Sequence, residues 1–321
     1  MLKIAIIIVN YRTAKLACKC IDSIVKNKSN KYETSIFIVD NDSNDDSGEI
    51  LSKKVDTTKG QVNLEFIPSS INGGYAYGNN LAIKHINKHA IKFDYFWLLN
   101  PDTEIKLGAD EALIAMFHNN NNIGICGSQL QDANGMTQAS AFRFPGVVSE
   151  SLNALKLGFL DKLFVRHKGV YEISSIPVRV DWVAGASMMI KASVLEKAPE
   201  MDEKFFLYYE EVDYCLKVKN NAWECWYVPG SKVIHYVGAA TGISDMRKKA
   251  PRRPRYWFDS RRRYFIKNNG KTSTLVTDVV FMICYFLWRL RRQIQKKDDL
   301  DPPMFLWDYF KNSVICKGFK I

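Results

Sequence analysis

Three acidic residues lie within one helical turn in the segment Glu210-Glu211-Val212-Asp213, directly after a run of aromatic residues. Glu210 and Asp213 share one face of a helix, and Glu211 is rotated from Glu210 by about 100°. Aromatic surroundings raise the pKa of a carboxyl group. A carboxylate of raised pKa suits a general base that removes a proton from a hydroxyl group. The alternative interpretation is the charged first turn of a surface helix.

Another carboxylate, Asp102, follows a strongly apolar run in the segment Asn100-Pro101-Asp102. Mg²⁺ takes one or two protein ligands and completes its shell with phosphate oxygens and water, so one Asp beside a diphosphate is enough to hold it. An Asn-Pro-Asp segment is also ordinary in a turn. His235 ends a short apolar run. It is either a metal ligand or, more commonly for a lone histidine in such a run, a residue of the core.

Two polar segments could bind a nucleotide. Asp40 follows an apolar run, where a carboxylate can accept hydrogen bonds from a base or a ribose, although Asp is also a common turn residue. Asn72-Gly73-Gly74-Tyr75 precedes a predicted helix. Its glycines allow close backbone approach, and a helix N-terminus favours a diphosphate, although the glycines also suit a plain loop. Neither the Walker nor the dinucleotide-binding pattern is present.

These residues need a scaffold, and the chain offers alternating strands and helices. Residues 3–9 are apolar and rich in β-branched types, which is typical of a strand buried on both faces. Strands are also predicted at 35–39, 62–67, 93–99, 123–127 and 224–228, with a strand–turn–strand at 181–190, and helices at 47–54, 75–88, 110–117, 148–155 and 208–218. The alternation predicts an α/β fold with a single doubly wound, mostly parallel sheet flanked by helices. Ligands bind beyond the carboxyl ends of such strands, where the polar segments lie.

Charge is concentrated late in the chain. The net charge is +11, but residues 247–297 hold sixteen Lys and Arg against two acids, and the first 246 residues are net acidic. A nucleic-acid-binding protein, the first alternative, would place positive charge around the sheet. A nucleotidyltransferase, the second, would need more acids near Asp102 and a basic glycine-rich loop after the first strand. The seven scattered cysteines indicate a reducing compartment, and we expect no secretion signal.

The basic segment includes an apolar stretch at residues 272–288, interrupted by Asp278. It is shorter than the ~20 residues that a spanning helix needs. We therefore predict a helical, membrane-associating appendage that lies on anionic lipid, with a helix docked on the main domain as the alternative. Its lipid contacts would come from Arg289, Arg291, Arg292, Lys296 and Lys297, and the phosphates of a lipid-linked acceptor could contact Arg252, Arg253, Arg255 and Arg261 to Arg263.

In their order and spacing, these residues resemble glycosyltransferase family 2, of GT-A fold. The resemblance spans residues 3–242 and is greatest to the rhamnosyltransferase-type branch that builds cell-wall and surface polysaccharides. Each motif is weak alone, whereas the ordered set is specific. The matching segments are Ile8-Val9-Asn10-Tyr11, Val39-Asp40-Asn41, Asn72-Gly73-Gly74-Tyr75 with Asn79-Asn80, Asn100-Pro101-Asp102, Trp182-Val183-Ala184-Gly185-Ala186, Tyr209-Glu210-Glu211-Val212-Asp213 and His235.

The resemblance implies a role for each matching residue. Asp40 would contact the nucleobase. Asn100 replaces the first Asp of the family's Asp-x-Asp motif. Asp102 and His235 would therefore bind the divalent cation, Mg²⁺ or Mn²⁺. The catalytic base would be Glu211, with Asp213 as the next candidate and Glu210 in the same cluster. The other nucleotide-binding residues would be Val9, Asn10, Tyr11, Asn72, Gly73, Gly74 and Asn79, and those on the acceptor or sugar side Trp182, Ala184 and Gly185.

The resemblance also implies an activity. The chain would move a sugar, with inversion, from a nucleotide diphosphate sugar to a polyprenyl-diphosphate-linked or glycan acceptor. The expected donor is dTDP-rhamnose, followed by UDP-hexoses. We expect a glycosyltransferase domain at 1–245, divided into a nucleotide-binding half at 1–128 and an acceptor half at 129–245, and the basic extension at 246–321. The expected location is cytoplasmic, at the inner face of the cell membrane, without nucleic acid. A homodimer and an inactive lectin-like relative stay open as alternatives.

Overall fold

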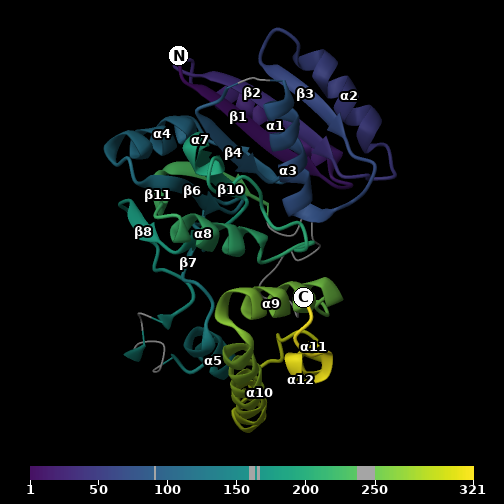
Figure 1. The fold of residues 1–321 in the computed structure, drawn as a ribbon, viewed down its shortest axis with the longest axis vertical. Coiled ribbons are helices and arrows are strands. Elements are labelled where there is room, and N and C mark those ends of the chain that lie inside the picture. The colour runs from purple at the N-terminus through teal and green to yellow at the C-terminus, as the bar shows by residue number, and fades with distance from the viewer. Residues whose placement is uncertain (90–91, 159–162, 165–166, 237–249) are drawn as a thin grey trace. The chain divides into compact units, whose positions relative to one another are not determined.

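The computed structural model describes residues 1–89, 92–158, 163–164, 167–236 and 250–321 (Figure 1). The chain forms two compact units. The sheet unit comprises Met1–Phe142, Glu172–Phe206 and Glu210–Gly242, and the helical unit comprises Arg143–Tyr171, Leu207–Tyr209 and Ile243–Ile321. The sequence-based boundary at residue 245 differs from this division, because Arg143–Tyr171 belongs with the C-terminal segment.

The main sheet has nine strands, eight of them in the order β3-β2-β1-β4-β10-β6-β11-β5, with β8 paired to β11. The predicted α/β fold is confirmed, and β3, β2, β1 and β4 are parallel. The prediction of a single sheet is wrong, because β7 and β9 form a separate ribbon, and the second half of the sheet is mixed. The strands are β1 (Lys3–Asn10), β2 (Glu33–Asp40), β3 (Asn63–Pro68), β4 (Tyr95–Leu99), β5 (Thr103–Ile105), β6 (Ile123–Gln131), β7 (Ala141–Phe142), β8 (Val178–Val180), β9 (Trp182–Val183), β10 (Ser187–Lys191) and β11 (Glu224–His235).

Helices cover both faces of the sheet. Ile4, Ile6 and Ile8 of β1 belong to the same apolar cluster as residues of α1, α2 and α4. Val9, one step out of phase, lies against Gly78 of α3 on the other face. The predicted doubly wound arrangement is therefore present. The helices of this unit are α1 (Ala14–Asn27), α2 (Ser47–Thr58), α3 (Gly74–Lys88), α4 (Ala109–Asn119), α7 (Ala192–Leu195) and α8 (Glu210–Asn220).

Strands β5 and β11 differ most from the prediction. We expected β11 to end near residue 228, where Pro229 and Gly230 interrupt its pattern. The strand instead continues to His235, with an irregular register between Val228 and Lys232. It then pairs antiparallel with the unpredicted β5, so that His235 stands opposite Thr103. This pairing fixes His235 one residue away from Asp102.

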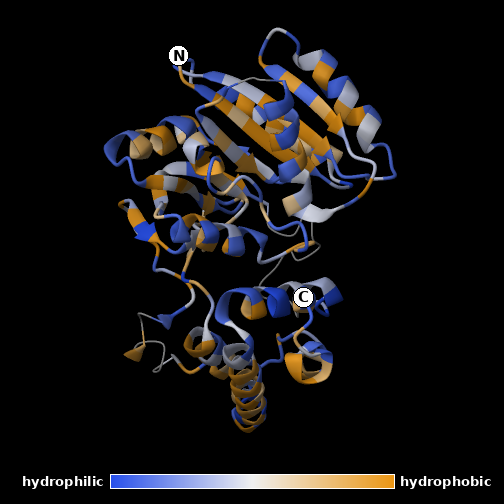
Figure 2. Cartoon of the chain, in the orientation of Figure 1, coloured by the Kyte–Doolittle hydropathy of each residue, from blue (hydrophilic) through white to orange (hydrophobic). Residues whose placement is uncertain are grey.

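The helical unit is built around α10, which runs for 24 residues and not the predicted 17. Its buried side chains include Phe281, Tyr285 and Trp288, which pack with Phe258 and Tyr309 in an aromatic core. Figure 2 shows the apolar character of α10 along most of its length. The helices of this unit are α5 (Val147–Leu155), α9 (Arg255–Asn269), α10 (Lys271–Ile294), α11 (Phe305–Asn312) and α12 (Val314–Lys317).

Asp278 is a buried, paired carboxylate on the inner face of α10. It accepts hydrogen bonds from Arg261 Nη1 at 2.7 Å, Tyr309 Oη at 3.1 Å and the backbone N–H of Val314 at 2.9 Å. Arg261 also pairs with Glu150 and is 3% exposed. The prediction that Arg261 contacts acceptor phosphates is therefore wrong, because the guanidinium is enclosed and already neutralised.

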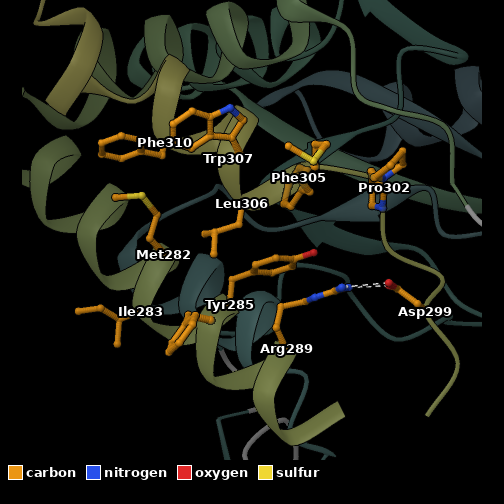
Figure 3. A pocket seen from close by; sticks show the side chains of 13 residues that line it. Met282, Ile283, Tyr285, Arg289, Asp299, Pro302, Phe305, Leu306, Trp307 and Phe310 are labelled. Atoms are coloured by element: carbon orange, nitrogen blue, oxygen red, sulfur yellow. Dashed lines mark hydrogen bonds and ion pairs between the residues drawn. The ribbon is translucent and has the colours of Figure 1, made fainter. Parts of the chain in front are cut away.

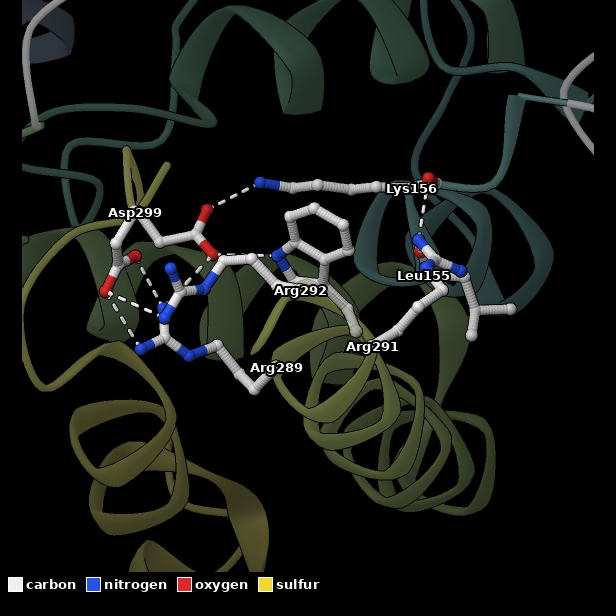
Figure 4. Close-up of polar contacts among 8 residues, drawn as sticks. Leu155, Lys156, Arg289, Arg291, Arg292 and Asp299 are labelled. Carbon is white, nitrogen blue, oxygen red and sulfur yellow. Dashed lines mark hydrogen bonds and ion pairs between the residues drawn. The ribbon is translucent and has the colours of Figure 1, made fainter. Parts of the chain in front are cut away.

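Several basic residues at the end of α10 bind within the chain (Figure 4). Arg289 forms a two-point ion pair with Asp299 at 2.6 and 2.9 Å. Arg291 donates to the carbonyls of Leu155 and Lys156, and Arg292 to that of Lys297. These three arginines were predicted to contact lipid. Their side chains instead hold the end of α10 to neighbouring parts of the same unit.

We predict that Asp278→Ala destabilises the protein, because it leaves the buried Arg261 guanidinium and two other donors without their acceptor. The free energy of unfolding should fall by about 3–5 kcal/mol. Urea denaturation followed by circular dichroism measures the change. The control, Asp56→Ala, removes an exposed ion pair with Lys59 and should cost less than about 1 kcal/mol. Equal, small losses in both variants would contradict the proposed role of Asp278.

Candidate active site

Asp40 is held at the end of β2 by its neighbours in the sheet. Its Oδ1 accepts hydrogen bonds from Asn10 Nδ2 at 2.6 Å and from Ser43 Oγ at 2.5 Å, and its Oδ2 accepts one from the Ser43 backbone N–H at 3.2 Å. Asn10 is the Cα partner of Asp40 in the ladder, and its Oδ1 accepts from Thr13. The predicted residues Asn10 and Asp40 are therefore in direct contact. Asn10 is completely buried and can only position Asp40, whereas Tyr11 is 41% exposed.

The Asn72-Gly73-Gly74-Tyr75 loop is tied to this edge. Asn41 Nδ2 donates to the carbonyl of Gly74 at 2.8 Å, and Asn72 Oδ1 accepts from the Gly74 N–H at 3.1 Å. Gly74 has φ of +85°, and a Cβ there would lie 1.9 Å from the carbonyl oxygen of Phe206. Only glycine fits this position without strain. The tight loop therefore places the N-terminus of α3 beside Asp40.

Two buried amide oxygens near this loop have no hydrogen-bond partner among the described residues. They are Oδ1 of Asn41 and Oδ1 of Asn79, whose residues are 2% and 1% exposed. Asn79 was predicted to bind the nucleotide, whereas the side-chain role of Asn41 was missed. Buried polar groups are normally hydrogen-bonded, which makes these two oxygens candidate contacts for a bound ligand.

Asp102 and His235 form the second part of the site. Asp102 lies in the turn between β4 and β5 and is 4% exposed. Its Oδ1 lies 3.5 Å from Nε2 of His235 and has no hydrogen-bond partner within the described part of the chain. The turn is fixed by Thr103, whose Oγ1 donates to the Asn100 carbonyl at 2.7 Å. The sequence-predicted pair is thus brought together by the β5–β11 ladder.

This pair fits a divalent cation as part of a ligand set. A carboxylate and an imidazole nitrogen are metal ligands, and the orphaned Oδ1 of Asp102 leaves a lone pair available. Within the described ranges, no cluster of three or more His, Cys, Asp or Glu could hold a metal ion. A cation here would therefore need phosphate oxygens and water to complete its shell, as Mg²⁺ commonly does.

The acidic cluster lies in the first turn of α8. Glu210 and Asp213 are 4% and 3% exposed, and Glu211 is half-buried, as expected for a residue rotated to another face. Burial raises the pKa of Glu211 to about 7. Burial and the neighbouring Glu211 raise the pKa of Glu210 well above its usual range. Oε2 of each glutamate has no hydrogen-bond partner among the described residues. Glu211 is thus the most accessible of the three and can titrate near neutrality.

Tyr75 connects the two parts of the site, which we did not predict. Its hydroxyl donates to the carbonyl of Gly185 at 2.7 Å, and the neighbouring Ala186 carbonyl accepts from the Asn100 N–H at 3.1 Å. Burial, then Glu211 and Glu210, raise the pKa of the Tyr75 hydroxyl. Hydrogen bonds therefore run from Tyr75 through the 184–186 turn to the Asp102 turn, and the acidic cluster acts on the Tyr75 hydroxyl through its charge. The only signal in the sequence was the position of Tyr75 within the glycine motif.

The predicted acceptor-side residues lie in this turn and in the β7–β9 ribbon. Trp182 stacks on Phe142, with ring centroids 4.2 Å apart and planes at 19°. One face of the indole is thus occupied by the protein. Ala184 donates its N–H to the carbonyl of Ser140, and Gly185 lies beside the Tyr75 ring. Ala184 and Gly185 therefore position the turn that links Tyr75 to Asn100.

We expect Asp102→Ala to weaken the binding of UDP or dTDP in the presence of Mg²⁺ or Mn²⁺ by about 10- to 100-fold, because a cation ligand is lost. Thermal shifts over a nucleotide titration measure the affinity. Asp56→Ala, which alters an exposed carboxylate, should bind like the unaltered protein. A variant at position 102 that retains the full metal-dependent shift would refute the metal assignment.

Glu211→Gln should make the protein more stable at pH 8. The folded-state pKa of about 7 lies above the usual 4.5, so ionisation of this carboxyl group disfavours the folded state as the pH rises between these values. Removing the charge should raise Tm by on the order of a few degrees at pH 8. The difference should close below pH 4.5, where both states are protonated. Differential scanning calorimetry from pH 4 to 8 tests this, and a variant less stable at pH 8 would contradict it.

The sequence of the chain is similar to those of known glycosyltransferases. Residues 5–164 match the family described as Glycosyl transferase family 2. The chain is 24% identical to N-acetylglucosaminyl-diphospho-decaprenol L-rhamnosyltransferase of Mycobacterium tuberculosis strain H37Rv. The alignment spans 217 residues, which are 65% of this chain and 68% of that protein. The chain is 26% identical over 179 residues to Rhamnosyltransferase WbbL of Escherichia coli K12, which covers 54% of this chain and less than two thirds, 64%, of that protein.

Solved structures share the fold. The mannosyltransferase PcManGT from Pyrobaculum calidifontis, in complex with GDP-Man and Mn²⁺, aligns with a TM-score of 0.58 at 10% identity, over 91% of this chain and 74% of that one. S. aureus TarS 1–349 in complex with UDP-GlcNAc aligns with a TM-score of 0.55 at 13% identity, over 97% and 82%. The solved structures show the GT-A fold, and the family match and the sequence relatives show that the chain is an inverting enzyme of glycosyltransferase family 2.

Proposed function

We propose that this enzyme transfers rhamnose from dTDP-rhamnose to a hydroxyl group of a lipid-linked or oligosaccharide acceptor in surface polysaccharide synthesis. The observation that carries the proposed transfer step is the half-buried Glu211 in the first turn of α8, where burial raises the pKa of its carboxyl group to about 7. The two rhamnosyltransferases among its relatives support the sugar, and the decaprenol-linked substrate named for one of them supports the acceptor class. UDP-hexoses are the second choice of donor.

Asp40 and the glycine loop bind the nucleotide in this proposal. Asp40 retains acceptor capacity on Oδ2 for the N–H of a pyrimidine or the hydroxyl of a sugar. The Oδ1 atoms of Asn41 and Asn79, which have no hydrogen-bond partner among the described residues, add acceptors beside the loop. The N-terminus of α3 favours the negative diphosphate, and the glycines let the backbone approach it closely.

Asp102 and His235 would hold the divalent cation at the diphosphate. When bound there, the cation would act as a Lewis acid that neutralises charge on the leaving nucleotide. The short distance of 3.5 Å between the two ligands lets both reach one ion. The proposed requirement for Mg²⁺ or Mn²⁺ is supported by the Mn²⁺ named for the related mannosyltransferase structure.

Glu211 acts as the general base. It accepts the proton of the acceptor hydroxyl while that oxygen attacks the anomeric carbon from the side opposite the diphosphate. One displacement of this kind inverts the anomeric centre. A pKa near the working pH suits this task, because the carboxylate is present in the base form and still takes the proton readily. The hydrogen bond from the Tyr75 hydroxyl to Gly185 fixes the glycine loop relative to the 184–186 turn.

The proposed location is the cytoplasmic side of the cell membrane, with the enzyme bound peripherally. A nucleotide sugar is water-soluble, whereas a polyprenyl-linked acceptor is confined to the bilayer. The charge of the helical unit supports this location, because residues 250–321 hold sixteen Lys and Arg against six Asp.

Glu211→Gln should lower kcat by about 10²- to 10⁴-fold, because the acceptor proton then has no base, and should leave nucleotide binding unchanged. The assay follows transfer from dTDP-rhamnose to a polyprenyl-diphosphate-linked acceptor with Mg²⁺, and NMR of the product reports the anomeric configuration. In the unaltered enzyme, kcat/KM should rise with pH up to about 7 and then level off, since the base must be ionised.

The matched control is Glu49→Gln, which changes an exposed glutamate of α2 and should have full activity. Full activity of Glu211→Gln would remove Glu211 from the mechanism. If the enzyme transfers sugar only from UDP-hexoses, the proposed donor is wrong and the proposed mechanism is unaffected. A product with retained anomeric configuration would contradict the single displacement.

A further inference from the structure

Helix α10 has two apolar faces on opposite sides. The inner face includes Thr277, Asp278, Phe281, Cys284, Tyr285 and Trp288, all buried. The outer stripe consists of Val276, Val279, Ile283, Phe286, Leu287 and Leu290, which are between 37% and 55% exposed. At about 100° per residue, the outer stripe is centred roughly 170–190° from the inner face. A soluble surface helix carries polar side chains on that outer side, so this stripe is an interaction surface.

The outer stripe continues into a groove between α10 and α11 with a volume of about 910 Å³. Met282, Ile283 and Phe286 line it from α10, and Leu306, Trp307 and Phe310 from α11 (Figure 3). Trp307 is 48% exposed although it is the largest of these side chains. Among the described residues that line the groove, Arg289 and Asp299 are the only charged ones, and they form an ion pair with each other. The groove is therefore suited to hydrocarbon.

Length and composition alone would allow α10 to cross a membrane, which corrects our expectation from the shorter predicted helix. Its inner face argues against this. Asp278 and Arg261 are buried there, and α9, which carries Arg261 to Arg263, packs along it. A helix that is covered by a charged partner on one side cannot be surrounded by lipid. Only the outer stripe is available to a membrane.

Exposed cations flank the stripe. Lys271 begins α10, and Lys296 and Lys297 follow its end. Lys311 places its Nζ 4.8 Å from the centroid of the Trp307 ring. An apolar stripe with an exposed Trp and lysines at its border matches a helix that lies in the interface of an anionic leaflet. Charge complementarity thus favours lipid over a second copy of this equally basic unit.

We propose that α10 and α11 lie in the plane of an anionic membrane leaflet, with the outer stripe and the groove in contact with lipid acyl chains. The inference deepens the proposed function, on which it rests for the acceptor's place in a bilayer. The helix both packs on the protein and enters the lipid, with opposite faces.

The test is flotation of the full chain with vesicles of phosphatidylcholine and phosphatidylglycerol, 7:3, and with pure phosphatidylcholine. The unaltered protein should float with the anionic vesicles. The double variant I283E/F286E should need at least tenfold more lipid for the same fraction of protein to float. The matched control L107E/M136E places the same charges on exposed apolar residues of the sheet unit and should bind normally. Circular dichroism checks that each variant is folded.

A second measurement locates the contact. Brominated lipid should quench the tryptophan fluorescence of the unaltered protein, and Trp307→Phe should remove most of that quenching. Normal flotation of I283E/F286E would overturn the proposal. So would light scattering that shows the unaltered protein as a dimer and I283E/F286E as a monomer, because the outer stripe would then bind a second copy of the chain. Nucleotide-dependent thermal shifts, which need no lipid, report separately on the proposed function. If the unaltered protein floats with anionic vesicles but shows no thermal shift with nucleotide, the proposed sugar-transfer site is rejected and the proposed membrane face is retained.

Discussion

Buried carboxyl oxygens without hydrogen-bond partners among the described residues are the constraint on which the site depends. Asp102 Oδ1, Glu210 Oε2 and Glu211 Oε2 are all in this state, inside a unit whose other buried polar groups are mostly paired. Burial of an unpaired charge is costly, and the protein meets this cost by holding protons on the glutamates near neutral pH. A bound cation at Asp102 and an acceptor hydroxyl at Glu211 would supply the missing partners. The resting state is thus less stable than it could be, which is common for catalytic sites.

The two halves of the site are positioned by backbone pairing and not by direct contact. The β5–β11 ladder brings His235 to Asp102, and the β1–β2 ladder brings Asn10 to Asp40. Between them, Tyr75 spans from the glycine loop to Gly185, next to the residue that accepts from Asn100. The two ladders and the Tyr75 hydrogen bond, 2.7 Å long, therefore position the turns that carry Asp40 and Asp102. Glycine at position 74 is necessary because its φ is +85° and the Phe206 carbonyl, which accepts a hydrogen bond from the Tyr75 N–H, lies where a Cβ would be.

The sequence predicted the features that have strong local signals. The apolar runs located β1, β2 and β4, and polar residues at their ends located Asp40 and Asp102, because parallel strands collect their ligands at one edge. Strand β5 was missed because three residues show no periodicity, and β11 was cut short because Pro229 and Gly230 resemble a turn. The partners of Asp278 and Arg261 could not be found, since their pairing joins distant helices. Tyr75 was recognised as part of a motif, but its hydrogen bond depends on the fold.

The basic residues of the helical unit have two different roles. Its charge suggested lipid and phosphate contacts throughout, yet the arginines of α10 bind Asp299 and backbone carbonyls, whereas exposed lysines border the apolar stripe. Arginine suits the fixed, multiple hydrogen bonds of a folded segment, and lysine keeps a mobile charge in water.

In the proposed site, one nucleotide sugar bridges the Asp102–His235 pair and Glu211. This can be tested by a crystal structure of the protein grown with Mn²⁺ and a nucleotide sugar, with anomalous diffraction to locate the metal. We expect a manganese peak in bonding contact with Asp102 Oδ1 and His235 Nε2, a diphosphate on that ion, and the anomeric carbon facing Glu211. A diphosphate bound away from Asp102, or a sugar turned away from the α8 N-terminus, would contradict it.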